Sequence, residues 1–274
     1  MPKSLPPDMI VRRAVPTDIP SLADLFVSAP GDGELYQYPD FANHLDEMPK
    51  QHVKWLCQVI CDPTMSIRVA VIPEPEKQDR IVGFSGWKKM EFDQEYGDVR
   101  AVELVDVAWS HADEEVLADL ASQLDSGPSH ELQPDPARKE AISRCRKTAT
   151  LPPPSLSTTR YELCGLAVHN EYQGHGIGSE LVQWGLDRAT EERIPVFVGG
   201  EERGIGFYEG ALGFRRLKST EYWLDGEGRD IAREEVDAGN RDWERERGGV
   251  SGADAVWLPE SVDEGLADAL RGYM

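Results

Sequence analysis

Three glycines at alternate positions, Gly174, Gly176 and Gly178, separate a strand pattern from a helix pattern, and they restrict the folds open to this chain more than any other feature. Before them, Tyr161–Val168 is mostly apolar, as in a strand covered on both faces. After them, apolar residues recur at helical spacing from about Ile177 to Glu192. Glycine lets an anion approach the backbone closely, and the first N–H groups of a helix have no partner within it. The pattern predicts an α/β fold with an anion-binding turn.

The surroundings of these glycines bear on which anion site this is. A nucleotide-binding P-loop ends in Gly-Lys-Ser/Thr, whereas this loop ends in Gly178-Ser179 without the lysine. A dinucleotide fingerprint has its glycines almost directly after the strand, whereas His169–Gln173 intervene here. A turn that only starts a helix is the alternative for the glycines taken alone. The loop therefore predicts an anion site without naming the anion.

Two segments together resemble a known family. The first, Val168-His169-Asn170-Glu171-Tyr172-Gln173-Gly174-His175-Gly176-Ile177-Gly178, resembles motif A of the GNAT N-acetyltransferase superfamily. That motif has Gln/Arg-x-x-Gly-x-Gly/Ala after a strand and before a long helix. The second, Arg203–Phe214, is similar to motif B, a Gly/Ala-x-x-Phe/Leu-Tyr-x-x-x-Gly-Phe helix and turn. The resemblance is strong over about residues 160 to 217 and weaker over 9 to 90; Asn170 departs from the proline that many members have.

The resemblance implies both a fold and a reaction. The fold is a mixed, mostly antiparallel central sheet with helices on both faces, a three-layer α/β/α arrangement with a large insertion before the motif A strand. The reaction moves an acetyl group from acetyl-CoA to a primary amine of a small molecule or protein, by direct attack on the thioester. The implied cofactor-binding residues hold the pantetheine arm through backbone groups of Leu166, Ala167 and Val168. They hold the pyrophosphate through N–H groups of the loop, at Gln173, Gly174, His175, Gly176, Ile177, Gly178 and Ser179.

Acetyl transfer from a thioester needs an acceptor for the amine proton, oxyanion stabilisation and a proton for the leaving thiolate. Tyr208 occupies the motif B tyrosine, which in many members lies near the coenzyme A sulfur as general acid; the alternative is a tyrosine that only packs by its ring. Glu162, on the strand before the loop, is the candidate base, and a solvated carboxylate at a strand edge is the equal alternative. A backbone N–H near Leu166–Val168 would stabilise the oxyanion. Glu201 stands where the family often has Asn or Ser, and it could repel coenzyme A phosphates.

The rest of the chain divides into a regular part and two irregular parts. Residues 1–224 are expected to form one acetyltransferase-like domain that includes an insertion at about 91–158, with a helix at Val116–Leu124 and loops at Ser126–Pro136 and Leu151–Thr159. Residues 225–274 are expected to form an acidic, mobile tail, apart from docking by Val256–Leu258 and the amphipathic end Val262–Leu270. The other expected elements are a strand at Met9–Val15, helices to Val27 and over Gln51–Cys61, a turn at Gly31–Gly33, a hairpin of Ser66–Ile72 with Ile81–Met90, a strand at Pro195–Val198, a helix at Gly204–Leu212, and a final hairpin of Phe214–Leu217 with Tyr222–Leu224.

Charge and composition limit the kinds of partner that the protein is expected to bind. The formal net charge of −21 repels nucleic acid phosphates and would attract a cationic amine. No apolar run is long enough to cross a membrane, and no secretory signal is evident, so a cytoplasmic location is expected. The four cysteines are expected to be reduced, and no metal site is readable.

The acceptor side is expected at the Gly31–Leu45 loop, the hairpin near Trp87 and the insertion. Its candidate cation-binding residues are Glu34, Tyr36, Tyr38, Glu103 and Asp106. Two other functions stay open at this point: a non-catalytic acyl-CoA-binding or scaffold module with the same fold, and a nucleotide-binding protein that uses the glycines for ATP.

Overall fold

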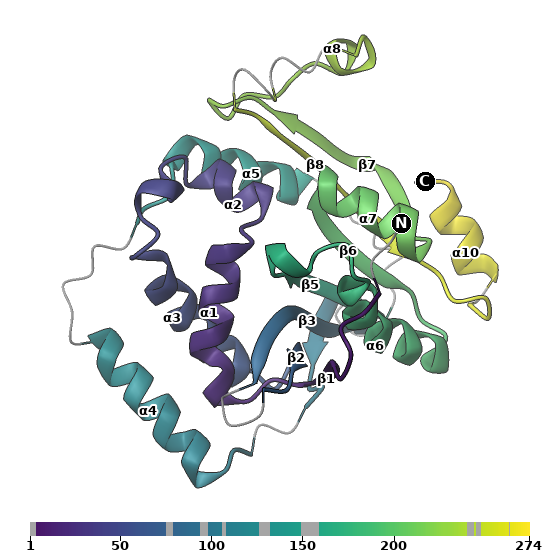
Figure 1. Ribbon diagram of the computed structural model, residues 1–274. Coiled ribbons are helices and arrows are strands. Elements are labelled where there is room, and N and C mark those ends of the chain that lie inside the picture. Colours follow the sequence, from purple (N-terminus) through teal and green to yellow (C-terminus); the bar gives the residue numbers. More distant parts are fainter. Residues whose placement is uncertain are drawn as a thin grey trace.

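A single mixed sheet runs through the computed structural model (Figure 1). The structure describes residues 4–74, 79–93, 98–105, 108–125, 132–148, 159–239, 244, 248–262 and 264–274. Among these residues the strand order is β1-β2-β3-β5-β6-β8-β7, and β4 pairs with β3 off this path. All described pairs are antiparallel except β5 with β6. The strands are β1 (Ile10–Arg13), β2 (Met65–Ile72), β3 (Arg80–Asp93), β4 (Asp98–Val102), β5 (Arg160–Val168), β6 (Val196–Glu201), β7 (Arg215–Leu224) and β8 (Val250–Trp257).

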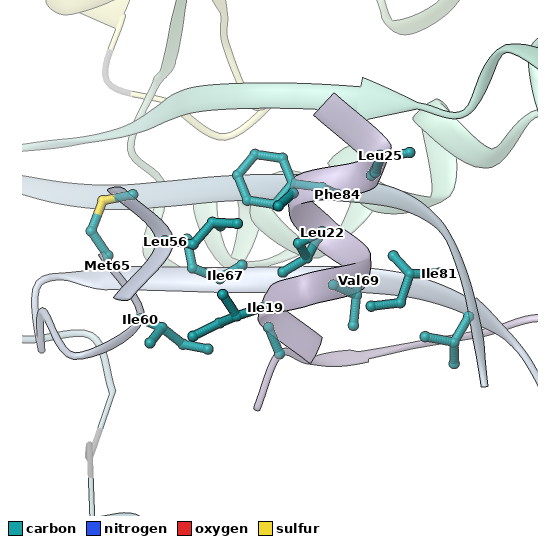
Figure 2. Packing of buried hydrophobic residues seen from close by; sticks show 13 residues of the cluster. Ile19, Leu22, Leu25, Leu56, Ile60, Met65, Ile67, Val69, Ile81 and Phe84 are labelled. Carbon is teal, nitrogen blue, oxygen red and sulfur yellow. The ribbon is translucent and has the colours of Figure 1, made fainter. Parts of the chain in front are cut away.

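Helices cover both faces of the sheet, as the sequence predicts. On one face, α1 (Ile19–Ser28) and α3 (Met48–Ile60) pack on the side chains of β2 and β3. Figure 2 shows this layer, in which the labelled side chains are Ile19, Leu22, Leu25, Leu56, Ile60, Met65, Ile67, Val69, Ile81 and Phe84. On the other face, α6 (Ile177–Glu192) and α7 (Glu202–Leu212) cover β5, β6 and β8. Successive side chains of β2 point to opposite faces of the sheet, so this strand contributes to both layers. Val69 packs with α1 and α3, whereas Ala70 packs with Ile177 of α6.

The helix α6 approaches the sheet closely at Gly185. A Cβ atom built on Gly185 would lie 2.2 Å from Cη2 of Trp87, so the indole of β3 fills the space where a side chain would be. Trp87 is completely buried and donates its Nε1 hydrogen to Ser85 Oγ at 3.2 Å. The Trp87 ring therefore points into the core beneath α6, and the expectation that the hairpin near it flanks the acceptor side stays a prediction.

The insertion contains more regular structure than expected. The helix expected at Val116–Leu124 is confirmed as part of α4 (His111–Asp125), and a further helix, α5 (Pro136–Thr148), follows it. Ala141 and Ile142 of α5 are buried against Tyr36, Leu224 and Val250. This short apolar stripe uses the sheet as its core, so α5 folds without a core of its own. The loop expected at Leu151–Thr159 lies, except for Thr159, outside the described residues.

The C-terminal part contradicts two expectations. The expected final hairpin is a single strand, β7, whose pairing with β8 is irregular between Leu217 and Tyr222. The expected mobile tail is wrong for Val250–Ala255, which lie with Val256 and Trp257 in β8 between β6 and β7. The physical reason is burial, because Ala253 and Ala255 belong to the core cluster that also contains Ile205 and Tyr208 of α7.

Docking of the chain end is confirmed. The helix α10 (Glu264–Arg271) buries Ala267 and Leu270, and Leu270 packs with Phe197 and Val256. Two short helices complete the described elements, α2 (Asp32–Gln37), which begins inside the turn expected at Gly31–Gly33, and α8 (Arg233–Asp237).

Candidate active site

The strands β5 and β6 run side by side for three residue pairs and then part. The last pair joins Leu163 to Val198. From there β6 continues to Glu201 beside β8, whereas β5 continues beside β3. The edge of β5 over Cys164–Val168 therefore has no strand partner on its β6 side among the described residues. A gap of this kind exposes backbone hydrogen-bonding groups to whatever enters it.

A β-bulge stands at the point where the strands part. On β3, Trp87 pairs with Leu163 and the adjacent Gly86 pairs with Gly165, so Cys164 is an extra residue on β5. Bulges bend a strand and redirect its side chains, and they are common beside active sites. This one turns β5 away from β6 and leaves Cys164 exposed.

The glycine loop after β5 has the backbone conformation that the sequence predicts. Gly174 (φ +79°) and Gly176 (φ +85°) are left-handed, a conformation that costs glycine little, and Gly176 precedes the first turn of α6. Nδ1 of His175 lies 2.9 Å from the carbonyl oxygen of Tyr172, so this side chain braces the loop. The free N–H groups of the first helical turn point into the loop, which suits an anion.

Gln173 connects this loop to the helix of the second segment. Its Nε2 donates to the carbonyl of Val168 at 3.1 Å and to Oδ1 of Asn170 at 3.0 Å. Its Oε1 accepts a hydrogen bond of 2.8 Å from Nη2 of Arg203, an exposed residue in the first turn of α7. Sequence reasoning missed Arg203, because only the fold brings it beside a loop thirty positions earlier. The loop therefore has a guanidinium at its edge.

The two segments also pack directly on each other. A Cβ on Gly178 would lie 3.2 Å from Cζ of Phe207 in α7, tighter than an ordinary contact. Glycine at 178 thus allows the first turn of α6 to approach α7 closely, beside Leu166 of β5.

Tyr208 lies in α7 between two aromatic rings. Its ring centroid is 5.4 Å from that of Phe207 and 5.5 Å from that of Phe214, and 6% of the residue is exposed. Burial, with a smaller contribution from the Glu201 carboxylate, raises the pKa of Tyr208 far above its ordinary value. The hydroxyl therefore keeps its proton throughout the physiological range, as a general acid must.

The carboxylate of Glu201 packs against α2. Its Oε1 lies 2.0 Å from the position that a Cβ atom on Gly33 of this helix would occupy. The adjacent Glu202 binds Arg216 with two bonds of 2.7 and 2.8 Å. The carboxylate of Glu202 is thus paired with Arg216, whereas the adjacent Arg203 bonds to Gln173 of the glycine loop.

The sequence left two environments open for Glu162, a buried strand and a solvated strand edge. The side chain is 28% exposed, and Oε1 accepts bonds of 2.9 and 2.7 Å from Nε and Nη2 of Arg160. The guanidinium of Arg160 in turn lies over the ring of Phe197, 5.4 Å from its centroid. Glu162 therefore sits at the open side of the sheet, with one carboxylate oxygen bonded to Arg160.

A cleft of about 310 Å³ opens beside Glu162, on the face away from α6 and α7. It begins at Leu163 and Val198, where the strands part, and it includes the carboxylate of Asp254 from β8. We call it the inner cleft, and its lining residues are Cys145, Glu162, Leu163, Cys164, Phe197, Val198, Gly199, Gly200, Thr220, Tyr222, Ala253 and Asp254.

The expected acceptor residues do not line the inner cleft among the described residues. Oε1 of Glu34 is 2.8 Å from Nε2 of His52, and the buried Tyr36 donates its hydroxyl hydrogen to the carbonyl of Asp225 at 2.7 Å. Tyr38 and Glu103 lie elsewhere, and Asp106 is outside the described residues. Asp254 does line the inner cleft, and it lies in the segment that was expected to be the acidic tail.

Among the described residues, no group of three or more His, Cys, Asp or Glu side chains could hold a metal ion. None of the described helices is both long and apolar enough to span a bilayer.

Comparisons with known proteins point to one family. The model of the family described as acetyltransferase (GNAT) matches residues 143–214, a range that contains both the glycine loop and Tyr208. Curated protein sequences give no significant match.

Several solved structures are similar in fold at low identity. One, described as histone acetyltransferase HPA2 and related acetyltransferase from Corynebacterium glutamicum, is 15% identical with a TM-score of 0.48, over 93% of this chain and 98% of that chain. The polyamine N-acetyltransferase of Drosophila melanogaster is 13% identical with a TM-score of 0.45, over 92% and 100%. The ribosomal-protein-alanine N-acetyltransferase of Brucella melitensis is 14% identical with a TM-score of 0.40, over 91% and 99%.

Proposed function

Residues 143–214 belong to the acetyltransferase (GNAT) family, as the two segments predict, and from this premise we propose that the protein transfers the acetyl group of acetyl-CoA to a primary amine. The observation that carries the proposal is the parting of β5 from β6 next to the glycine loop. A cofactor with an anionic end and an extended polar arm fits the glycine loop and the strand edge together. The loop would bind the anion, and the unpaired edge of β5 would bind the arm.

The proposed roles follow from this placement. Backbone N–H groups from Gln173 to Ser179 bind the pyrophosphate, and Arg203 adds a cation at the loop edge. Backbone groups of Leu166, Ala167 and Val168 pair with the pantetheine arm and direct the thioester carbonyl toward Cys164. A backbone N–H of this stretch stabilises the oxyanion.

The chemistry then needs an amine on the open side and an acid at the sulfur. The amine attacks from the inner cleft, so the N–C bond forms while the C–S bond breaks. The free oxygen of the Glu162 carboxylate accepts the proton that the amine loses, directly or through water, and Tyr208 donates a proton to the departing thiolate. A tyrosine hydroxyl carries its proton at neutral pH, so Tyr208 is protonated when the thiolate leaves.

The test measures thiol release from acetyl-CoA with a panel of primary amines, together with coenzyme A affinity by calorimetry. We expect release that depends on the amine. Tyr208→Phe keeps the ring packing and removes the proton donor, so turnover should fall by about a hundredfold or more while coenzyme A affinity stays within twofold. Equal turnover in the variant would contradict the acid role of Tyr208.

Coenzyme A binding without thiol release for any amine would favour a non-catalytic acyl-CoA-binding module. Protection against heat by ATP rather than coenzyme A would favour the nucleotide-binding alternative.

A further inference from the structure

A second hollow adjoins the inner cleft. It measures about 280 Å³ and lies along the exposed side of β7. Its lining residues are Arg144, Cys145, Ser219, Thr220, Glu221, Tyr222, Trp223, Asp230 and Ile231. Three of them, Cys145, Thr220 and Tyr222, also line the inner cleft. The two hollows therefore adjoin at these residues, and together they extend from the place where β5 and β6 part to the outer part of β7; we call the pair the acceptor groove.

The floor of the outer half is an irregular part of an edge strand. β7 is the last strand of the described sheet, and its ladder with β8 breaks between Leu217 and Tyr222. Within this break Thr220 is turned inward, where its Oγ1 accepts from the N–H of Asp254 at 2.8 Å. Ser219 and Glu221 lie in the same break and line the groove. The N–H of Lys218 already donates to the carbonyl of Tyr273 at 3.0 Å, and the carbonyl of Trp223 accepts from Ile231 at 2.9 Å, so an extended chain would lie along the residues between them.

The wall of the groove is α5, which the insertion provides. Arg138 anchors it, because its Nε donates to the carbonyl of Gly226 at 2.7 Å and its Nη1 to that of Tyr36 at 3.0 Å. Arg144 anchors its other end, with bonds of 3.2 Å to the carbonyl of Gly228 and 2.9 Å to Asp230. The insertion therefore places a fixed helix over β7, and this helix turns an open sheet face into a groove.

Acidic side chains of the groove are paired with arginines at both of its ends. At the inner end Glu162 binds Arg160 through one carboxylate oxygen, and Glu162 and Asp254 line the cleft in which the proposed function puts the amine. At the outer end the acidic side chains are matched by arginines: Asp230 binds Arg144 at 2.9 Å, and Glu221 binds Arg233 at 3.0 Å. A second ammonium group, as in a polyamine, would meet a carboxylate that already has its counter-ion. Hydroxyl and backbone groups in a charge-balanced groove suit a neutral chain rich in amides.

We propose that the acceptor is the amino end of an extended polypeptide. Its α-amine lies in the inner cleft, and the residues that follow lie along β7 beneath α5. This inference rests on the proposed function, since it names the substrate class of the same site. At roughly 3.3 Å per extended residue, the stretch from Ser219 to Trp223 matches about four residues of the acceptor beyond the amine.

The test is a length series with one amino-terminal residue held constant. Amides of one, two, four and six residues are compared by kcat/KM for thiol release, next to a linear polyamine. Contacts remote from the reacting amine should raise kcat/KM about tenfold or more between one and four residues, with little further gain at six. The polyamine should not exceed the one-residue amide. A kcat/KM that is independent of length, or a polyamine that exceeds the four-residue peptide, would overturn the proposal.

A pair of variants locates the effect. Ser219 is exposed, and it lines only the outer half of the groove. Ser219→Trp should therefore fill this half, so that kcat/KM for the four-residue amide falls to about that for the one-residue amide. Lys218→Trp is the matched control, because Lys218 is exposed next to it but does not line the groove, and the ratio should persist. A persisting ratio in Ser219→Trp would also overturn the proposal.

Different results would refute the proposed acetyl transfer and the proposed peptide acceptor. Coenzyme A affinity and the thermal midpoint are measured for all three proteins. A wild-type protein that binds no coenzyme A refutes the proposed function, whereas one that acetylates amines with no preference for length refutes only the peptide acceptor.

Discussion

Arg203 gives the glycine loop a property that the loop lacks by itself. In the proposed function the loop would bind an anion through N–H groups, which are dipoles and carry no net charge. Arg203 adds a full charge at its edge, and Gln173 holds the guanidinium there by accepting one of its hydrogens. In a chain with a net charge of −21, this local cation counteracts the repulsion that a phosphate would otherwise meet.

Arg203→Gln should therefore weaken coenzyme A binding by about three- to tenfold, because it removes a charge-assisted bond at an exposed and partly screened position. Calorimetry at low and high salt measures this, and the difference from wild type should shrink as salt rises. The control is Arg215→Gln, an exposed arginine on β7 that lies outside the loop. An unchanged Kd in Arg203→Gln at low salt would exclude a phosphate contact.

At the residue scale, the sequence shows which chemical groups are present but not what surrounds them. The glycines at 174 and 176 are left-handed as expected, since a turn of this kind needs glycine locally. The environment of Glu162 could not be predicted, because Arg160 and Glu162 point to the same face of a strand that a bulge then redirects. The site residues themselves remain predictions that the variants above would test.

Among the elements, α6 depends on one small residue for its position. Gly185 faces the buried ring of Trp87, and the helix rests on this ring. The same helix begins at the glycine loop, so its height above the sheet also sets where its first N–H groups lie.

Gly185→Ala should lower the free energy of unfolding by about 1–3 kcal/mol, because the added methyl would overlap the Trp87 ring and force the helix or the ring to move. Urea unfolding measures this. Gly210→Ala in α7 is the matched control, since a Cβ there meets no atom within 4 Å and alanine favours a helix by up to about 1 kcal/mol. Equal stability of Gly185→Ala and wild type would mean that the contact relaxes without cost.

Elements with a strong periodic pattern could be predicted, and those that depend on distant partners could not. The bounds of α6 match the expectation, because glycines precede it and its apolar residues recur regularly. α5 was missed because its buried stripe is short, and it folds only against Tyr36 and Leu224. β8 was missed because Gly252, Ala253 and Ala255 give little apolar signal, although all three are buried in the sheet.

For the whole molecule, β8 has a structural role out of proportion to its sequence pattern. It pairs with β6 over six residues, twice as many as the three pairs between β6 and β5. It also carries β7, which has no other strand partner among the described residues. Without β8, one side of the inner cleft and the whole floor of the acceptor groove lose their support.

A chain that ends at residue 247 should therefore lose cooperative unfolding, as seen by circular dichroism during heating. A chain that ends at residue 263 lacks α10 and uncovers Phe197 and Val256, yet it keeps β8 in the sheet. We expect it to unfold cooperatively at a lower temperature. A sharp transition in the shorter chain would show that β6 and β7 hold their places without β8.

The position of β8 also sets the order in which the protein is completed during synthesis. β6 and β7 leave the ribosome before the strand that joins them, so their facing edges stay open while the intervening segment is translated. The proposed acyl-transfer site at the β5–β6 parting would mature only after residues 250–257 emerge, although the glycine loop and Tyr208 are translated earlier. Until then the nascent chain exposes two unpaired strand edges, the kind of surface that chaperones shield from aggregation.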